Sequence, residues 1–250
     1  PFAPTSNTQN TLFATETTWY DLGLSYDIQR DASDRLLHTI RDALQKRRAF
    51  RVNLFHEPGA GGTTLAKRIV WNCRHEVPCV MLRRTNPAET CDRLTFVSSM
   101  TGLPVLVAVD AGAVSDREAD ALYDCLSAAH VPAVIFQVVR RSAIPDGASS
   151  KKSVWLEANL SEVEADRFVH FLTREEPAKS QALRDALTDP YPGARTPFYL
   201  ALVAFEKDFV RLREYVQCRL SDLTEVQRKC VGYLVSVAEA ISGWLGADRG

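Results

Sequence analysis

The sequence predicts an α/β protein, with a parallel sheet flanked by helices and then an all-helical subdomain. Between residues 49 and 157, apolar runs of strand length alternate with helix-forming runs. Nearly continuous apolar strands separated by helices are typical of a parallel sheet that is buried on both faces. After about residue 158, the periodic segments have the spacing of amphipathic helices alone.

The elements follow one another in a regular order. Strands are predicted at residues 49–55, 79–83, 104–109, 133–139 and 154–157. Helices are predicted at residues 33–48, 63–74, 87–101 and 116–129. Ligands of such sheets bind at the carboxyl ends of the strands, so we expect the loops that follow the strands to form the functional site.

The remaining segments define the domain organisation. Ser161 can cap a helix, and Glu164 three residues later completes a capping box. Further helices are predicted at residues 178–187, 197–205, 209–220 and 225–245. Residues 1–30 are polar, and we expect mostly irregular structure there. The predicted parts are therefore a lead-in segment (1–30), a sheet domain (31–158) and a helical subdomain (159–250).

Composition narrows the functional classes. Hydrophobic residues make up 46% and charged residues 24%, which are ordinary globular values. The net charge of −1 gives no global electrostatic case for nucleic acid or membrane partners. The six scattered cysteines are expected to be reduced core thiols. Because the chain begins at Pro1 and shows no secretory signal, we expect a piece of a longer cytoplasmic protein.

The most informative segment spans residues 53–66 and reads NLFHEPGAGGTTLA. A strand, a glycine-rich turn and a helix in this order direct backbone N–H groups and the positive end of a helix dipole at an anion. Relative to the usual phosphate loop, G-x-x-x-x-G-K-[ST], His56 replaces the first glycine and Gly62 replaces the lysine. An alternative is an ordinary turn with glycines for tight packing. The predicted nucleotide-binding residues of the loop are Pro58, Gly59, Ala60, Gly61, Gly62, Thr63 and Thr64.

The missing lysine bears on the chemistry. Its ammonium group normally neutralises the β- and γ-phosphates and the charge of the transition state. Lys67 lies about one helical turn past Thr63, so we expect it to point away from the phosphates. Binding can rely on backbone amides and Mg²⁺, whereas fast hydrolysis is not expected.

Asp110 ends the apolar strand at residues 105–109, which is the Walker B arrangement. With Thr63, it is predicted to hold Mg²⁺. The alternative is an aspartate that caps a helix or forms a turn. The next residue is Ala111, where a catalytic glutamate is often found, and this is a second indication of slow hydrolysis.

Three charged residues are candidates for catalytic roles. Arg140 and Arg141 end a strand, where a guanidinium can sense the γ-phosphate. The alternative is a solvated basic pair. Glu57 is a further candidate, for positioning the attacking water.

Four segments together resemble the signal-transduction NTPases with numerous domains, the STAND class of P-loop NTPases. They read HEPGAGGTTLAKR, PVLVAVD, VPAVIFQVVRRS and RTPFYLALVAFEKDFVRLREYV. The resemblance covers roughly residues 31–220 and is greatest to the branch that includes the vertebrate sterile-alpha-motif-domain antiviral proteins and their bacterial relatives. In that branch the loop reads PGxGGTT, so a glycine in the lysine position is typical of the group.

This resemblance implies an ASCE-type core, with an additional strand between the strand of the phosphate loop and that of Asp110. It implies a helical subdomain that closes over the nucleotide, with Pro197 at the position of a nucleotide-contacting proline. Arg195-Thr196 departs from the usual GLP-like motif there. The class acts as an ATP/ADP- and Mg²⁺-dependent switch in signal transduction and innate immunity. The implied partners are sensor and effector domains of the same longer chain and a nucleotide-dependent homo-oligomer.

The favoured interpretation is a regulatory nucleotide-binding module with slow or absent hydrolysis. The first alternative is a degenerate NTPase-fold scaffold that binds no nucleotide and acts through protein or nucleic-acid contacts. A second is a nucleic-acid-binding module that uses Arg83-Arg84, Arg140-Arg141 and Lys151-Lys152, against which the near-neutral charge argues. An ATP-driven motor is least favoured, because two catalytic groups are missing.

Overall fold

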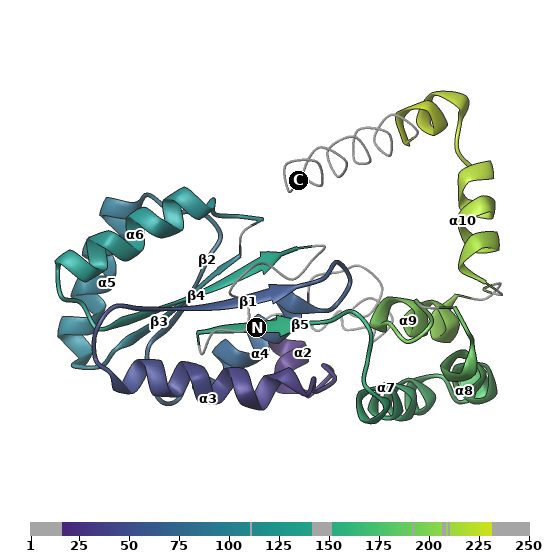
Figure 1. The fold of residues 1–250 in the computed structure, drawn as a ribbon, viewed down its shortest axis with the longest axis horizontal. Coiled ribbons are helices and arrows are strands. Elements are labelled where there is room, and N and C mark those ends of the chain that lie inside the picture. The colour runs from purple at the N-terminus through teal and green to yellow at the C-terminus, as the bar shows by residue number, and fades with distance from the viewer. Residues whose placement is uncertain are drawn as a thin grey trace, which may run out of the picture. The chain divides into compact units, whose positions relative to one another are not determined.

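The computed structural model describes residues 17–110, 112–141, 152–191, 193–206, 209 and 211–231. They belong to two compact units that divide after Phe205. The first unit contains the sheet and most of the helices (Figure 1). In the second unit, α10 (Leu212–Ser221) carries Tyr215 and Arg219, whose side chains both donate to the Glu206 carboxylate at 3.1 Å. The helix predicted at residues 225–245 lies largely outside the described residues.

A five-stranded parallel sheet forms the centre of the first unit. Its strands are β1 (Phe50–His56), β2 (Cys79–Leu82), β3 (Val105–Asp110), β4 (Ala133–Arg140) and β5 (Ser153–Leu156). Their order is β2-β3-β4-β1-β5, and each neighbouring pair is parallel. Because β4 lies between β1 and β3, the additional strand that the resemblance implied is confirmed.

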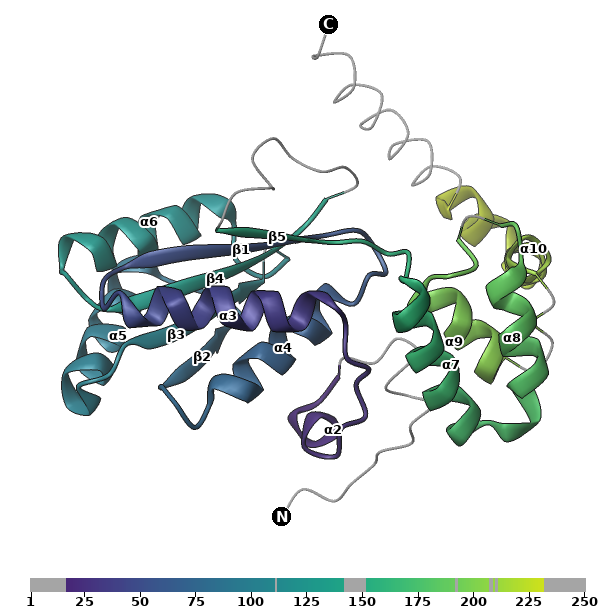
Figure 2. The ribbon, with the colours of Figure 1, turned by 60° about the horizontal axis from the view of Figure 1, so that its bottom comes forward.

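Helices cover both faces of this sheet (Figure 2). They are α3 (Ala32–Gln45), α4 (Gly62–Cys73), α5 (Pro87–Thr101) and α6 (Asp116–Ala128), while α2 (Trp19–Gly23) packs against α4. Helices α3 and α4 pack on one face of the sheet, and α5 and α6 pack on the other. The short helix α2 was not expected in the lead-in segment. It is stabilised by a capping box between Thr18 and Asp21.

The alternation of side chains along β3 shows how one sheet supports two cores. Leu106 and Ala108 contribute to the core under α3 and α4, while Val105, Val107 and Val109 contribute to the core under α5 and α6. Successive side chains of a strand point to opposite faces, and all five are fully buried. Burial of each valine or leucine stabilises the fold by about 1.5–3 kcal/mol. The carboxyl end of β3, and with it Asp110, is therefore firmly positioned.

A group of packed helices follows the sheet. It consists of α7 (Glu162–Glu175), the 3₁₀ turn η1 (Pro177–Lys179), α8 (Ser180–Thr188) and α9 (Pro197–Phe205). The capping box predicted for Ser161 and Glu164 is present at the start of α7. The predicted boundary at residue 158 falls in the connection between β5 and α7. The division into residues 31–158 and 159–250 stays a prediction.

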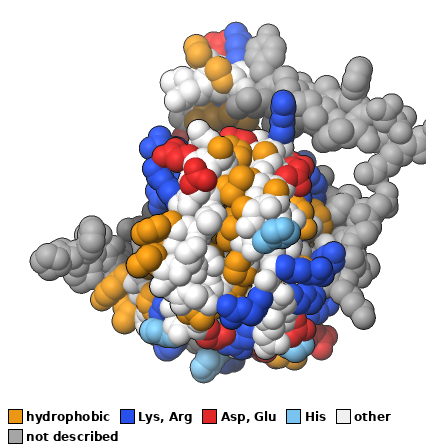
Figure 3. Space-filling model, turned by 90° about the vertical axis from the view of Figure 1, so that its left-hand side faces the viewer, with side chains coloured by type: hydrophobic (Ala, Val, Ile, Leu, Met, Phe, Trp, Pro, Cys, Tyr) orange, Lys and Arg blue, Asp and Glu red, His pale blue; other side chains and the backbone are white. Residues whose placement is uncertain are grey.

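Figure 3 shows apolar side chains on the surface of the face that carries α5 and α6. Phe96 and Met100, one turn apart on α5, are both largely exposed. Within the described residues, no helix is long and apolar enough to cross a membrane. Of the cysteines, Cys218 and Cys230 are exposed, so the expectation of core thiols fails for these two.

Candidate nucleotide-binding site

The glycine-rich loop joins the end of β1 to the start of α4. Gly59 has φ of 77° and Gly61 has φ of 84°, a left-handed conformation that favours glycine. A Cβ added to Gly61 would meet no atom within 4 Å. The left-handed backbone conformation at Gly61, and not a clash with neighbouring atoms, therefore favours glycine at this position. The loop leads into the first turn of α4, where Thr63 borders a cavity, and helix N-termini of this kind bind anions.

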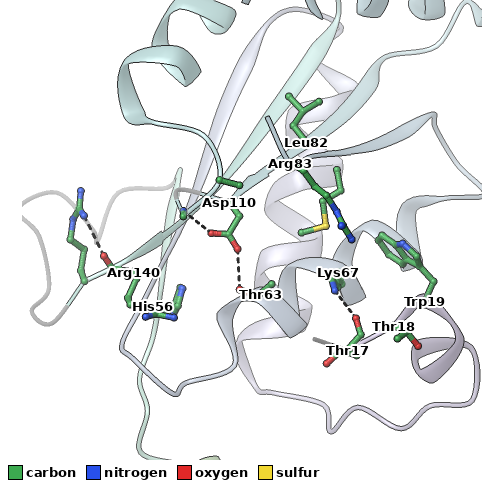
Figure 4. Close-up of a pocket in the computed structure, with 14 residues that line it drawn as sticks. Thr17, Thr18, Trp19, His56, Thr63, Lys67, Leu82, Arg83, Asp110 and Arg140 are labelled. Carbon is green, nitrogen blue, oxygen red and sulfur yellow. Dashed lines mark hydrogen bonds between the residues drawn. The ribbon is translucent and has the colours of Figure 1, made fainter. Parts of the chain in front are cut away.

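The two predicted metal ligands lie together at the carboxyl edge of the sheet (Figure 4). The Thr63 hydroxyl donates to Oδ2 of Asp110 at 3.0 Å. The backbone N–H of Gly112 donates to Oδ1 of the same carboxylate at 2.9 Å. Both carboxylate oxygens thus have a donor that fixes their orientation. A hydroxyl and a carboxylate are oxygen ligands of the kind that Mg²⁺ prefers.

A large cavity of about 1060 Å³ opens at this edge. Four predicted site residues line it: Thr63, Asp110, Arg140 and Arg141. The other lining residues are Thr17, Thr18, Trp19, His56, Lys67, Met81, Leu82, Arg83, Gly112 and Ala113. The convergence of the strand ends that the sequence indicated is therefore present. Arg141 is also close to Asp116, with 3.5 Å between Nη2 and Oδ2.

Glu57 lies differently from the other predicted catalytic residues. It is not among the residues that line the large cavity. Its Oε2 accepts a hydrogen bond from the backbone N–H of Ala158 at 2.6 Å, which ties the loop to the segment between β5 and α7. The structure does not bring this carboxylate together with Thr63 and Asp110.

Lys67 was expected to point away from the phosphates, and this stays a prediction. Its side chain is buried and lines the same cavity as Thr63. Helical side chains lean toward the N-terminus of the helix, so a residue one turn after Thr63 covers the turn that contains it. The Lys67 ammonium donates to the backbone carbonyl of Thr17 at 2.5 Å. The lead-in segment is therefore held against α4.

A smaller cavity of about 220 Å³ lies against the other side of the loop. Loop residues Gly59, Ala60, Gly61 and Thr64 line it, together with the apolar side chains of Tyr26, Ile28, Leu65, Phe168, Pro197 and Phe198. Pro197, the proline singled out in the sequence, thus lines the same cavity as the glycine-rich loop. Thr17 lines both cavities, and its hydroxyl is 3.1 Å from that of Thr64.

Sequence reasoning missed a buried ion pair beneath the loop. Arg30 Nε donates to Oε1 of Glu164 at 2.8 Å, and each side chain is 6% exposed. Arg30 also donates to the carbonyl oxygens of Ala60 in the loop and Glu157 after β5. The Glu164 carboxylate accepts from the backbone N–H groups of Asp31 and Ser161. In the sequence, Glu164 was interpreted only as part of the capping box with Ser161. That role already accounted for the residue, so nothing indicated a distant partner such as Arg30.

This network makes stability depend on pH. Burial opposes ionisation of Glu164, but the hydrogen bonds from Arg30, Asp31 and Ser161 outweigh it, so its pKa lies below the usual 4.5. The stabilisation is therefore complete above pH 4.5 and is lost as the pH falls through the lower pKa of the folded protein. We expect the difference in unfolding free energy between the wild type and Glu164→Gln to shrink in that acidic range. Urea titrations at several pH values measure it, and a constant difference would contradict the assignment.

The fold and site together define a class. A parallel sheet in the order β2-β3-β4-β1-β5, a glycine-rich loop after β1 and an aspartate at the end of β3 constitute a P-loop NTPase fold. No profile of a known protein family matches the chain. Two curated proteins match part of the chain, and both are named sterile alpha motif domain-containing protein 9-like. The human protein is 30% identical over 94 residues, which are 33% of this chain and 6% of that protein. The mouse protein is 29% identical over 94 residues, with the same coverage.

The chain therefore spans only 6% of the length of these relatives. Among solved structures, a RuvB variant from Thermotoga maritima has a TM-score of 0.46 and 15% identity, covering 89% of this chain and 84% of that one. The PCH-2 structure from C. elegans has a TM-score of 0.39 and 13% identity, covering 61% and 49%. The strand order and the loop, rather than these distant likenesses, define the fold.

Proposed function

We propose that this chain is a regulatory nucleotide-binding module of the STAND class, which binds ATP or ADP with Mg²⁺ and hydrolyses slowly or not at all. One observation carries the proposal: the Thr63 hydroxyl and the Asp110 carboxylate are 3.0 Å apart beside the glycine-rich loop. A strand-end aspartate and a helix-start threonine in contact form a ready Mg²⁺ ligand pair. Backbone N–H groups of Gly59, Gly61, Gly62 and Thr63 would hold the phosphates.

The residues of the larger cavity support slow turnover. Bound Mg²⁺ would neutralise phosphate charge, and Thr63 and Asp110 would hold it. Asp110 is the only carboxylate among the described residues that line this cavity, and both its oxygens already accept hydrogen bonds. It is therefore a poor base for activating water. Arg140 is the better γ-phosphate sensor of the two arginines, because Arg141 must first leave Asp116.

The smaller cavity suits the base of the nucleotide. It adjoins the phosphate loop, and its apolar lining comes from the lead-in segment, α4 and the helical group. Pro197 and Phe198 at the start of α9 form part of the wall. A base bound there would contact the loop and the helices together, and its presence would favour one arrangement of the two.

The same connections support a switch role. Arg30 bonds both the Ala60 carbonyl in the loop and Glu164 at the start of α7. A change in the loop on binding is therefore transmitted to the helical group. As in the class that the sequence resembles, we propose that the module controls sensor and effector domains of a longer cytoplasmic defence protein, through a nucleotide-dependent homo-oligomer.

Nucleotide binding predicts a change in thermal stability. A ligand that binds only the folded protein raises the free energy of unfolding by about 2.7 kcal/mol at 100 times its dissociation constant. We expect ATP or ADP with Mg²⁺ to raise the melting temperature of the wild type, and Thr63→Ala to lose the Mg²⁺-dependent part. Differential scanning fluorimetry with and without EDTA measures both.

Thr101→Ala is the matched control, because Thr101 is an exposed residue at the end of α5 that lines neither cavity. It should respond to nucleotide as the wild type does. If no nucleotide shifts the wild type at millimolar concentration, the proposal is wrong, and the chain is the non-binding scaffold that the sequence left as an alternative.

A further inference from the structure

The two departures of this loop from the usual phosphate loop are in contact with each other. His56 stands where the first glycine is expected, and Gly62 stands where the lysine is expected. A Cβ added to Gly62 would lie 2.7 Å from Nε2 of His56 and still closer to other atoms of the ring. Cγ, the ring atom nearest the backbone, would lie only 2.4 Å from that Cβ, so moving the far end of the ring alone does not remove the clash. With His56 in place, position 62 cannot carry a side chain.

The orientation of the imidazole is set by its other nitrogen. Nδ1 is 2.9 Å from the carbonyl oxygen of Glu57, and because that oxygen can only accept, Nδ1 carries the proton. Among the described residues, Nε2 has no hydrogen-bond partner. The ring lines the large cavity and lies beside the turn that contains Thr63 (Figure 4). One nitrogen is thus fixed to the loop, and the other is available at the cavity.

We propose that His56 is the phosphate-contacting side chain of this loop. In this proposal the two substitutions depend on each other: His56 replaces the usual first glycine and takes over the phosphate contact of the usual lysine, which Gly62 replaces. The ring occupies the space in which the lysine side chain would begin. The inference rests on the proposed nucleotide binding and deepens it. It also explains why the lysine is absent: a side chain at position 62 and the ring of His56 exclude each other.

The chemistry requires one proton. With Nδ1 protonated, Nε2 can donate to a phosphate oxygen only as the imidazolium, which takes up one proton from solvent as the anion binds. The charged groups that act on the ring are Asp110 on β3 and Arg140 on β4, while Glu57 contacts it through its backbone carbonyl. Burial first, and the charge of Arg140 second, hold the pKa of His56 below its ordinary value, against the hydrogen bond to the Glu57 carbonyl and the charge of Asp110. A bound phosphate supplies the negative charge that stabilises the second proton.

The exchange is tested with a double-mutant cycle on ADP and ATP binding in Mg²⁺. His56→Gly should weaken binding roughly ten- to hundredfold, the size of one hydrogen bond to a charged group. Gly62→Lys alone should also bind more weakly than the wild type, because the ring obstructs the new side chain. The double variant His56→Gly/Gly62→Lys recreates the usual pattern and should recover binding to within a few-fold of the wild type. Isothermal titration calorimetry measures all four proteins.

Two further variants separate phosphate contact from packing. His56→Phe fills the same space without a donor, and we expect it to fold and to bind as weakly as His56→Gly. His130→Gly is the control, since His130 is an exposed residue with φ of 53° where glycine fits, and it should bind as the wild type does. Melting temperatures without nucleotide show that each variant is folded.

The pH dependence gives an independent readout. The affinity of the wild type should fall between about pH 6 and pH 8 as the imidazolium is lost, whereas the double variant keeps its charged lysine and should change less. The inference is overturned if wild type binds nucleotide and His56→Phe binds equally well, or if Gly62→Lys alone binds as tightly as the double variant. Absence of binding by the wild type would instead overturn the proposed function, and the inference with it.

Discussion

Glu164→Gln is expected to lower the free energy of unfolding by about 3–5 kcal/mol, the usual cost of removing one partner of a buried ion pair. The substitution leaves the Arg30 guanidinium buried with no opposite charge. Glutamine can still serve in the capping box at the start of α7, so the loss reports the pair and not the cap. The free energy is measured from equilibrium unfolding in urea, followed by circular dichroism.

A surface pair provides the comparison. Glu89 and Arg93 are one turn apart on α5, with exposed side chains. Because exposed pairs contribute little, Glu89→Gln should change stability by less than about 1 kcal/mol. If both variants lose a similar small amount, Arg30 and Glu164 do not hold the loop to the helical group in the way the contacts indicate. A large loss of unfolding free energy in Glu164→Gln, with little loss in Glu89→Gln, supports the conclusion that Arg30 and Glu164 hold the loop to the helical group.

Asp110→Ala is expected to abolish the Mg²⁺ dependence of nucleotide binding. The variant removes the carboxylate that Thr63 and the backbone of Gly112 both contact. Groups that only support a metal ligand already cost about 10- to 100-fold in metal affinity when removed, so a direct ligand should cost at least as much. Calorimetric titration of ADP and ATP, in Mg²⁺ and in EDTA, should give equal affinities for the variant and different ones for the wild type.

Asp120→Ala is the control for a lost negative charge. Asp120 lies on α6, where it pairs with Arg51 away from the large cavity. It should keep the full Mg²⁺ dependence of the wild type. A variant at Asp110 that binds Mg²⁺-nucleotide as well as this control would show that the carboxylate acts only as a turn-forming group, the alternative that the sequence left open.

The strands and helices of the sheet domain could be predicted because each carries a strong local signal. The strand β3 is almost purely β-branched and apolar, and α5 begins with a proline in its first turn, at the residue predicted. Their order in the sheet had no such signal. The position of β4 between β1 and β3 followed from the family resemblance and not from hydrophobic pattern.

Site residues that belong to a sequence motif could be predicted. Contacts between segments that are far apart in the sequence could not. Thr63 and Asp110 occupy defined positions of two motifs, and they are in contact. The position of Lys67 in the wall of the large cavity was not predicted, because helical spacing alone was considered, without the lean of side chains toward the N-terminus. The contact between His56 and Gly62, and the link from Arg30 to Glu164, depend on three-dimensional packing that spacing in the sequence does not encode.

The double contact of Thr17 bears on how a shorter version of this protein should be designed. Its carbonyl holds the ammonium of Lys67, its hydroxyl lies against Thr64, and it borders both cavities. A fragment that began at residue 31 would keep every sequence motif, yet it would remove a wall shared by the two cavities and expose a buried lysine. The smallest useful fragment therefore starts before Thr17, and truncation at the apparent start of the sheet domain would change the site it was meant to isolate.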